Sequence, residues 1–143
     1  MPKGKTMRVR QAGFSLIEML IVLALMGILT AIAVPQYNAY RLRANRADAK
    51  VALVEGAQRM ERFFTRASTY VGADDAVTGA KLSDKSGSGL YTIGFEGALS
   101  AGGFVLQAVP TGGQAADDCG TLKIDQTGRK WAEKGGSSVA GCW

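Results

Sequence analysis

The sequence contains no histidine among its 143 residues, and this absence bounds what the protein can do. Histidine is the commonest general base, proton shuttle and metal ligand in proteins, so its absence lowers the expectation of catalysis. The sequence also lacks a nucleophile motif, a glycine-rich phosphate loop and a set of metal-ligating side chains. We therefore expect that the protein is not an enzyme and that it needs no cofactor and no metal.

Cysteine is scarce as well, since the chain has only Cys119 and Cys142. They do not have the CxxC spacing of a redox motif, and two thiolates without histidine are too few for a structural zinc site. A single disulfide is the simplest interpretation. It would close a loop of about 24 residues and stabilise the fold by about 3 kcal/mol. Because such bonds persist in oxidising compartments, we expect the C-terminal part to lie outside the cytoplasm.

The net charge of +5 is concentrated at the N-terminus. Four of the seventeen basic residues precede Phe14, namely Lys3, Lys5, Arg8 and Arg10. Without them, thirteen basic residues stand against twelve acidic ones, so the rest of the chain is close to neutral. The basic balance therefore indicates the topology of a membrane segment more than it indicates a nucleic-acid partner.

Residues 14–34 form an apolar run in which Glu18 is the single charged residue. A helix over this run spans about 30 Å, the thickness of the hydrocarbon core of a bilayer. Three interpretations stay open: a membrane span, a signal anchor that keeps its leader, and a cleavable secretory signal ending at the small residues AIA of positions 31–33. The length of the run and the charge inside it both argue against the cleavable secretory signal.

Glu18 needs an explanation, because a carboxylate in a lipid-facing helix costs about 2 to 3.5 kcal/mol near the bilayer centre and less near its surface. One interpretation is that Glu18 reaches the headgroup region, one turn from the charged leader. Another is that cleavage before Phe14 creates a positive amine four residues from the carboxylate. A neighbouring chain could then bring its own amine to Glu18, so that side-by-side assembly neutralises the charge.

The sequence GFSLIE at residues 13–18, after a short basic leader and before an apolar helix that ends at Pro35, resembles the signature of type IV prepilins. The resemblance implies that a prepilin peptidase cleaves between Gly13 and Phe14 at the cytoplasmic face and methylates the new amine of Phe14. It also implies that Glu18 pairs with the amine of an adjacent subunit during assembly. In the filament, the segment from Gly27 to Pro35 would lose helicity.

Residues 36–66 are predicted to continue as an amphipathic helix, because apolar positions recur at spacings of three and four. Arg46 occupies the same stripe one turn before Ala49, so packing is expected to begin near Ala49. Residues 67–89 are rich in glycine, serine, threonine and aspartate and predict a long loop. The stripe consists of Ala49, Leu53, Gly56, Met60 and Phe63, and the charged residues interpreted as solvated surface are Glu55, Arg59, Glu61, Arg62 and Arg66.

Three strands are predicted within residues 90–143, at 90–95, 104–109 and 121–130, each bounded by glycine or proline. An antiparallel sheet packed on the helix stripe gives an α+β fold. Asp117 and Asp118 by themselves supply too few oxygens for a calcium site. The arrangement resembles the pilin fold, which implies a cleaved leader at 1–13, a transmembrane assembly helix at 14–35, an amphipathic helix half at 36–66, an αβ loop at 67–89 and a sheet at 90–143 with a disulfide-bounded C-terminal region.

The C-terminal part, residues 108–131 with the closing GCW of 141–143, resembles minor pilins through looser motifs. The resemblance implies a type IV pilus subunit that is incorporated into, or primes, an extracellular filament for adhesion, twitching motility and DNA uptake. Its partners would be other pilin subunits, the prepilin peptidase and the inner membrane. The chain would cross that membrane once, with the leader in the cytoplasm and the C-terminal domain in the periplasm, until assembly moves it into the extracellular pilus.

Two alternatives stay open beside this interpretation. Pseudopilins of type II secretion share the N-terminal signature, although the major ones typically lack this cysteine pair and bind calcium. A minor pilin of a competence pilus would bind DNA or a surface through exposed cations and aromatic rings. Scattered cations on a nearly neutral domain are more often solvated surface. The candidate contacts are Lys81, Lys85, Lys123, Arg129, Lys130, Lys134, Tyr91 and Trp131.

Overall fold

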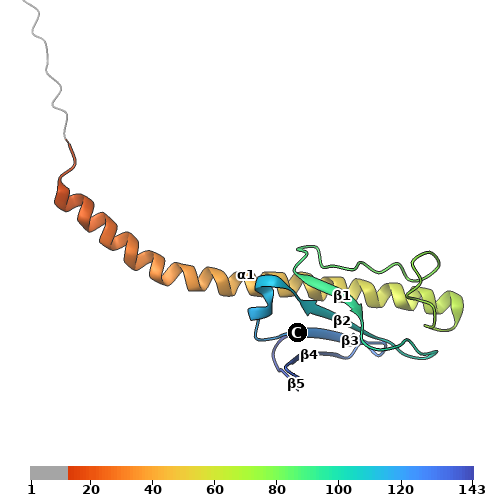
Figure 1. The fold of residues 1–143 in the computed structure, drawn as a ribbon. Coiled ribbons are helices and arrows are strands. Elements are labelled where there is room, and N and C mark those ends of the chain that lie inside the picture. The colour runs from red at the N-terminus through yellow and green to blue at the C-terminus, as the bar shows by residue number, and fades with distance from the viewer. Residues whose placement is uncertain (1–12) are drawn as a thin grey trace, which may run out of the picture. The chain divides into compact units, whose positions relative to one another are not determined.

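The structure is a computed structural model that describes residues 13–143, and the basic leader inferred from the sequence lies, apart from Gly13, outside the described residues. The chain divides into two compact units, Met1–Asn38 and Ala39–Trp143. One long helix, α1 (Leu16–Ala67), contributes residues to both units, and a five-stranded sheet belongs to the second (Figure 1). The predicted α+β fold, a long N-terminal helix with a small antiparallel sheet, is confirmed.

The helix of the first unit begins immediately after Ser15, which caps it. The Ser15 Oγ accepts a hydrogen bond of 3.2 Å from the backbone N–H of Glu18, the arrangement expected of a serine at a helix N-cap. α1 is long and apolar enough to cross a membrane, and none of its most apolar window is buried. It continues through Gly27 and Pro35 in this single chain, so the loss of helicity between them stays a prediction about the filament.

The sheet of the second unit is an antiparallel meander in which each strand pairs with the next. β1 (Tyr91–Phe95) pairs with β2 (Val105–Pro110), and both strands confirm the predicted ones to within one residue. β3 (Thr121–Asp125) and β4 (Lys130–Lys134) follow, with the short β5 (Ser137–Ser138) at the edge. A 3₁₀ helix, η1 (Gly112–Ala116), connects β2 to β3.

The prediction of one strand over residues 121–130 is wrong, because the chain turns back after Asp125. The Asp125 Oδ1 accepts hydrogen bonds from the backbone N–H groups of Thr127 and Arg129 and from the Thr127 hydroxyl. Gly128 has a φ of 79°, a left-handed conformation that glycine adopts without strain. The residues after this turn form β4, which pairs with β3 in register Lys123 to Trp131.

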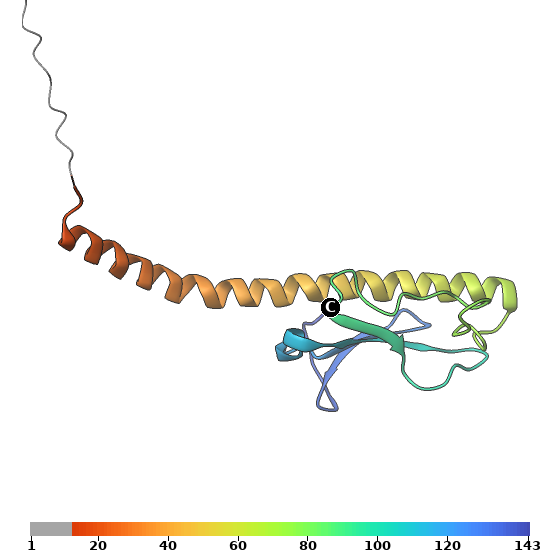
Figure 2. The same ribbon diagram turned by 45° about the horizontal axis from the view of Figure 1, so that its top comes forward.

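The core of the second unit lies between the sheet and the part of α1 that belongs to this unit, which run side by side in both views (Figures 1 and 2). Ala49, Leu53, Gly56 and Met60 are buried as the stripe predicts, and Phe63 is partly buried. A Cβ on Gly56 would lie 3.0 Å from the Leu106 Cδ1, so glycine lets the helix approach β2 closely. Ordered packing begins earlier than Ala49, because Arg46 pairs with Asp117 instead of pointing into solvent.

Candidate assembly site and charged surfaces

The candidate assembly site is the start of α1. Glu18 and Phe14 are both exposed, Phe14 with 76% of its surface accessible. Within residues 13–143, Glu18 makes no ion pair. Its position in the first helical turn places the carboxylate at the positive end of the helix dipole, which stabilises a negative charge there by about 0.3 to 1 kcal/mol. The site is therefore an exposed acid on an apolar helix.

A buried polar network joins α1 to the segment that follows β2. The Arg46 guanidinium donates through Nε to the Asp117 Oδ2 at 2.9 Å and through Nη2 to the Oδ1 at 2.5 Å. Tyr91 and Gln114 also donate to the Asp117 Oδ2, at 3.1 Å each. Gln114 is held to the helix by the Asn45 amide and by the Leu42 carbonyl oxygen. The network anchors η1 on the helix.

The ionisation of Asp117 depends on these contacts. Burial alone would raise the pKa of this carboxyl, but the hydrogen bonds from Arg46, the Cys119 N–H and Tyr91 outweigh it and hold the pKa below its usual value. Burial raises the pKa of the neighbouring Tyr91 phenol to about 12. Hydrogen-bond donors thus surround the Asp117 oxygens, and its neighbour Asp118 has a fully exposed side chain. The two acids do not converge on a common site.

Lys123 is buried and does not present its charge to a ligand. Only 5% of its surface is exposed, and its Nζ donates to Glu96 at 2.6 Å and to Glu133 at 2.5 Å. Burial lowers the pKa of this ammonium, but the hydrogen bonds that it donates to Glu133 and Glu96 raise the pKa by more, so the pKa lies above its usual value. The interpretation of Lys123 as a DNA contact is therefore wrong, and so is that of Tyr91, which is fully buried.

The remaining candidate cations are exposed and lie in different places. Arg129 lies over the Trp131 ring, with 4.6 Å from its Cζ to the ring centroid, and Lys130 lies 5.4 Å from the centroid of the Trp143 ring. Lys134 donates to the backbone oxygen of Asp117 at 3.0 Å. Lys85 and Lys81 belong to the connection between α1 and β1. The structure does not gather all these cations into one cluster.

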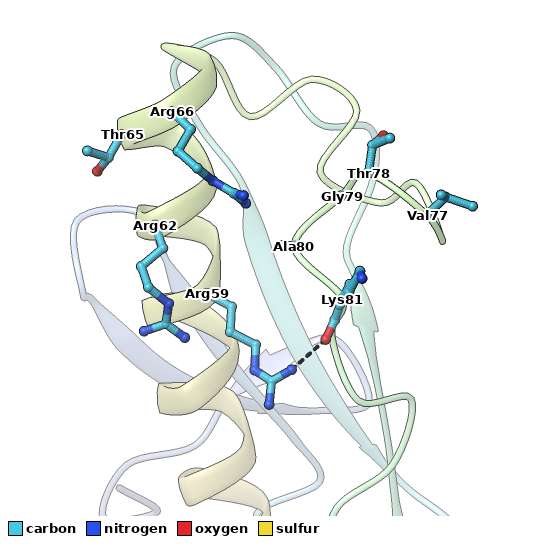
Figure 3. A pocket seen from close by; sticks show the side chains of 9 residues that line it. All are labelled: Arg59, Arg62, Thr65, Arg66, Val77, Thr78, Gly79, Ala80 and Lys81. Carbon is cyan, nitrogen blue, oxygen red and sulfur yellow. Dashed lines mark hydrogen bonds between the residues drawn. The ribbon is translucent and has the colours of Figure 1, made fainter.

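A second charged surface is a groove between the last turns of α1 and residues 77–81, with a volume of about 940 Å³ (Figure 3). Sequence reasoning interpreted its arginines as solvated surface, although their spacing of three and four residues already placed them on one helix face. The groove is lined by Arg59, Arg62, Thr65, Arg66, Val77, Thr78, Gly79, Ala80 and Lys81, none of which is acidic.

The C-terminal region is closed by a disulfide between Cys119 and Cys142, whose Cα atoms lie 5.6 Å apart. Both cysteines are buried in the core cluster. The bond therefore ties the last residues of the chain to the start of β3.

The comparisons with known proteins agree with this architecture. Residues 8–34 match the prokaryotic N-terminal methylation motif, and residues 35–123 match the family described as type IV minor pilin ComP, DNA uptake sequence receptor. The chain belongs to the type IV pilin family. It is a pilin subunit, and membership implies assembly with other pilin subunits and processing at the N-terminus.

Individual relatives support the assignment of this pilin. A fimbrial protein of Pseudomonas aeruginosa is 31% identical over 142 residues, which cover 85% of this chain and 90% of that protein. The type IV major pilin protein PilA of Myxococcus xanthus is 38% identical over 61 residues, 43% of this chain and 28% of that protein. A solved type IV pilin from Shewanella oneidensis is 30% identical with a TM-score of 0.50, covering 71% of this chain and 97% of that one.

Proposed function

We propose that the protein is a minor subunit of a type IV pilus and that Glu18 directs its assembly. The observation that carries the proposal is an exposed carboxylate in the first turn of an apolar helix, inside the matched methylation motif, without an ion-pair partner among residues 13–143. A carboxylate in that position needs a cation once lipid or other helices surround it. The N-terminal amine of a neighbouring subunit supplies one.

Processing creates that cation. In the precursor, the nitrogen of Phe14 belongs to a neutral amide and cannot pair with a carboxylate. Hydrolysis of the bond between Gly13 and Phe14 by a prepilin peptidase releases the leader and leaves an ammonium on Phe14, which stays cationic after methylation. The Glu18 carboxylate of an adjacent subunit then forms an ion pair with this ammonium, so that the two charges neutralise each other in an apolar filament core.

The same interpretation assigns the topology. Before assembly, α1 anchors the subunit in the inner membrane, with the leader in the cytoplasm and the second unit in the periplasm. The disulfide supports this orientation, because such bonds persist in oxidising compartments. The protein acts as a structural subunit without catalytic activity, in adhesion, twitching motility and DNA uptake. The three named relatives are a fimbrial protein, a major pilin and a type IV pilin, which favours a pilus over a secretion pseudopilus.

Mass analysis of the N-terminus tests the proposal, on protein extracted from the membrane and on protein that sediments with sheared filaments. In both samples the chain is expected to begin at Phe14 and to carry a methyl group. A mature chain that begins at Val34 would instead identify a secretory signal. An intact leader on filament-bound protein would contradict the processing step.

A second candidate function is DNA binding by the second unit, which the match to the ComP family over residues 35–123 favours. Binding that rests on phosphate contacts weakens steeply with salt. The full chain in detergent is therefore expected to bind duplex DNA with an affinity that falls as monovalent salt rises. Absence of binding at low salt, or binding without salt dependence, would contradict this candidate.

A further inference from the structure

We infer that the groove between the end of α1 and residues 77–81 is where this pilin holds the phosphate backbone of duplex DNA; the inference rests on the second candidate function above. Arg59, Arg62 and Arg66 lie at spacings of three and four, so they share one face of the helix. In Figure 3, Arg59 and Arg66 extend from the helix towards the facing loop, which carries Lys81. Four cations thus surround one open groove.

These cations are not engaged by acids of the chain. Among residues 13–143, no salt bridge includes an arginine or the lysine of the groove. Glu61, which lies among these arginines in the sequence of the helix, instead accepts a hydrogen bond of 2.7 Å from the Tyr70 hydroxyl. A cation in the last turn of a helix complements the helix dipole, which accounts for Arg66 but not for arginines one and two turns earlier. The groove therefore carries more positive charge than the helix dipole accounts for.

The loop wall of the groove is held by its own hydrogen bonds. The Asp75 Oδ1 accepts from the backbone N–H groups of Val77 and Thr78 and from the Thr78 hydroxyl, at 2.6 to 2.9 Å. A Cβ on Gly79 would lie 2.4 Å from the backbone oxygens of Ala73 and Asp75, so only glycine fits there. A wall ordered in advance lowers the conformational entropy that binding costs.

Lys81 completes the wall in a strained conformation. Its φ of 52° lies in the left-handed region, which lysine rarely adopts. The conformation persists because the Lys81 carbonyl accepts a hydrogen bond of 2.7 Å from the Arg59 Nη1, which ties the loop to the helix. Strain of this kind gathers at functional sites, where it is retained for the position of a side chain.

The spacing of the arginines along the helix matches the axial spacing of nucleotides along a DNA strand. From Arg59 to Arg66, seven residues rise about 10 Å along the helix, which equals about three steps of 3.4 Å along one strand. Guanidinium groups bind phosphate oxygens in pairs of parallel hydrogen bonds, and threonine hydroxyls add neutral donors. A membrane surface fits less well, since Val77 is the only large apolar side chain that lines the groove and interfacial binding buries an apolar face.

The test compares two charge-matched variants of the full chain in detergent. Arg62→Gln with Arg66→Gln removes two cations from the groove, and Arg41→Gln with Arg43→Gln removes two exposed cations from the same helix outside it. Labelled duplex DNA is titrated at several salt concentrations. The groove variant is expected to lower the slope of log K against log salt by about 1.8 and to weaken binding about 30-fold near 0.15 M salt. The control variant is expected to bind like the unmodified chain.

Lys81→Asn provides a second variant, because asparagine tolerates the left-handed backbone and leaves the carbonyl in place for Arg59. It is expected to lower the slope by about 0.9. Equal binding by the groove variant and the unmodified chain would overturn the inference while leaving DNA binding intact. Equal losses in both double variants would overturn it as well, since net charge would then suffice. The groove would be assigned to a membrane instead if the groove variant bound vesicles with anionic lipid more weakly than the unmodified chain does, while the two bound DNA equally.

Discussion

At the scale of single residues, Asp117 joins α1 to the segment that follows β2 through a buried ion pair and several hydrogen bonds. Its side chain is 2% exposed and its partner Arg46 is 18% exposed, so the ion pair is largely withdrawn from water. Removing one member of such a pair leaves an uncompensated charge, which costs more than the pair contributes. The carboxylate also accepts from Tyr91 and Gln114, so its loss would leave several donors unsatisfied.

The first prediction concerns this carboxylate. Asp117→Asn is expected to lower the free energy of unfolding by about 3 kcal/mol, at the lower end for a buried pair because Arg46 keeps some access to water. Trp131 and Trp143, the two tryptophans of the chain, report urea unfolding of the second unit by fluorescence. Asp118→Asn is the matched control, because Asp118 is fully exposed, and should change stability by less than about 0.5 kcal/mol. Similar losses in both variants would contradict the network.

The second prediction is the pH dependence of the same contact. The folded-state pKa of Asp117 lies below its usual value, so its contribution to stability is fully present above the unfolded pKa of about 3.9 and is lost as the pH falls through the folded pKa. The difference in melting temperature between the unmodified chain and Asp117→Asn should stay constant from pH 7 to about 5 and narrow below about pH 4. A difference that is unchanged at pH 3 would show that ionisation of Asp117 is not involved.

Sequence reasoning could not find this pair. Arg46 and Asp117 are 71 positions apart, and no periodicity relates a helix residue to a loop residue beyond two strands.

The burial of Lys123 could not be predicted from the sequence for another reason. Alternation along β3 directs its side chain away from the helix, towards the face that normally meets water. On that face Trp131 of β4 lies directly opposite Lys123, and Glu96 and Glu133 accept hydrogen bonds from the Lys123 ammonium. The side chain of Lys123 is therefore covered.

At the scale of elements, the C-terminal strands depend on a covalent closure. The sheet ends in a two-residue strand, β5, which pairs only with β4. Such a short edge strand contributes little by itself. The disulfide holds Cys142, beyond β5, to Cys119, two residues before β3, and thereby encloses β3, β4 and β5 in one loop.

The third prediction follows from that loop. Replacing both cysteines, Cys119→Ser with Cys142→Ser, is expected to lower the free energy of unfolding by about 3 kcal/mol, because a chain cross-linked over 23 positions has fewer unfolded conformations. Urea unfolding with and without reductant measures the effect. Reductant should destabilise the unmodified chain and leave the double variant unchanged. A double variant as stable as the oxidised chain would show that noncovalent contacts alone hold the region.

The elements differ in how well the sequence predicts them. The helix stripe from Ala49 to Met60 and the first two strands follow from periodicity, because one face of each packs against the core. The turn between β3 and β4 was missed, since Asp125 ends a strand through its own side-chain hydrogen bonds and the residues on both sides favour strand. The arginine face of the groove was visible in its spacing, but the loop that faces it is not adjacent in sequence.

At the scale of the whole molecule, the chain combines an exposed apolar helical segment, the first part of α1, with a second unit that has its own core. The apolar half of α1 exposes its residues in the single chain, and burial of apolar surface favours covering them with membrane or with neighbouring subunits. Burial of this kind has little directionality. The charge pair between Glu18 and a processed N-terminus would fix the axial register of one subunit against the next.

The measurement that tests this account most directly is the incorporation of Glu18→Leu into filaments. The protein is expected to insert in the membrane and to lose its leader at Phe14, verified by mass, because leucine favours the apolar helix. Its amount in sheared filaments should nevertheless fall at least tenfold, the loss that corresponds to about 1.4 kcal/mol of assembly free energy. Ser15→Ala, which removes the helix cap but keeps the carboxylate, should assemble nearly as well as the unmodified chain. Full incorporation of processed Glu18→Leu protein would contradict the account.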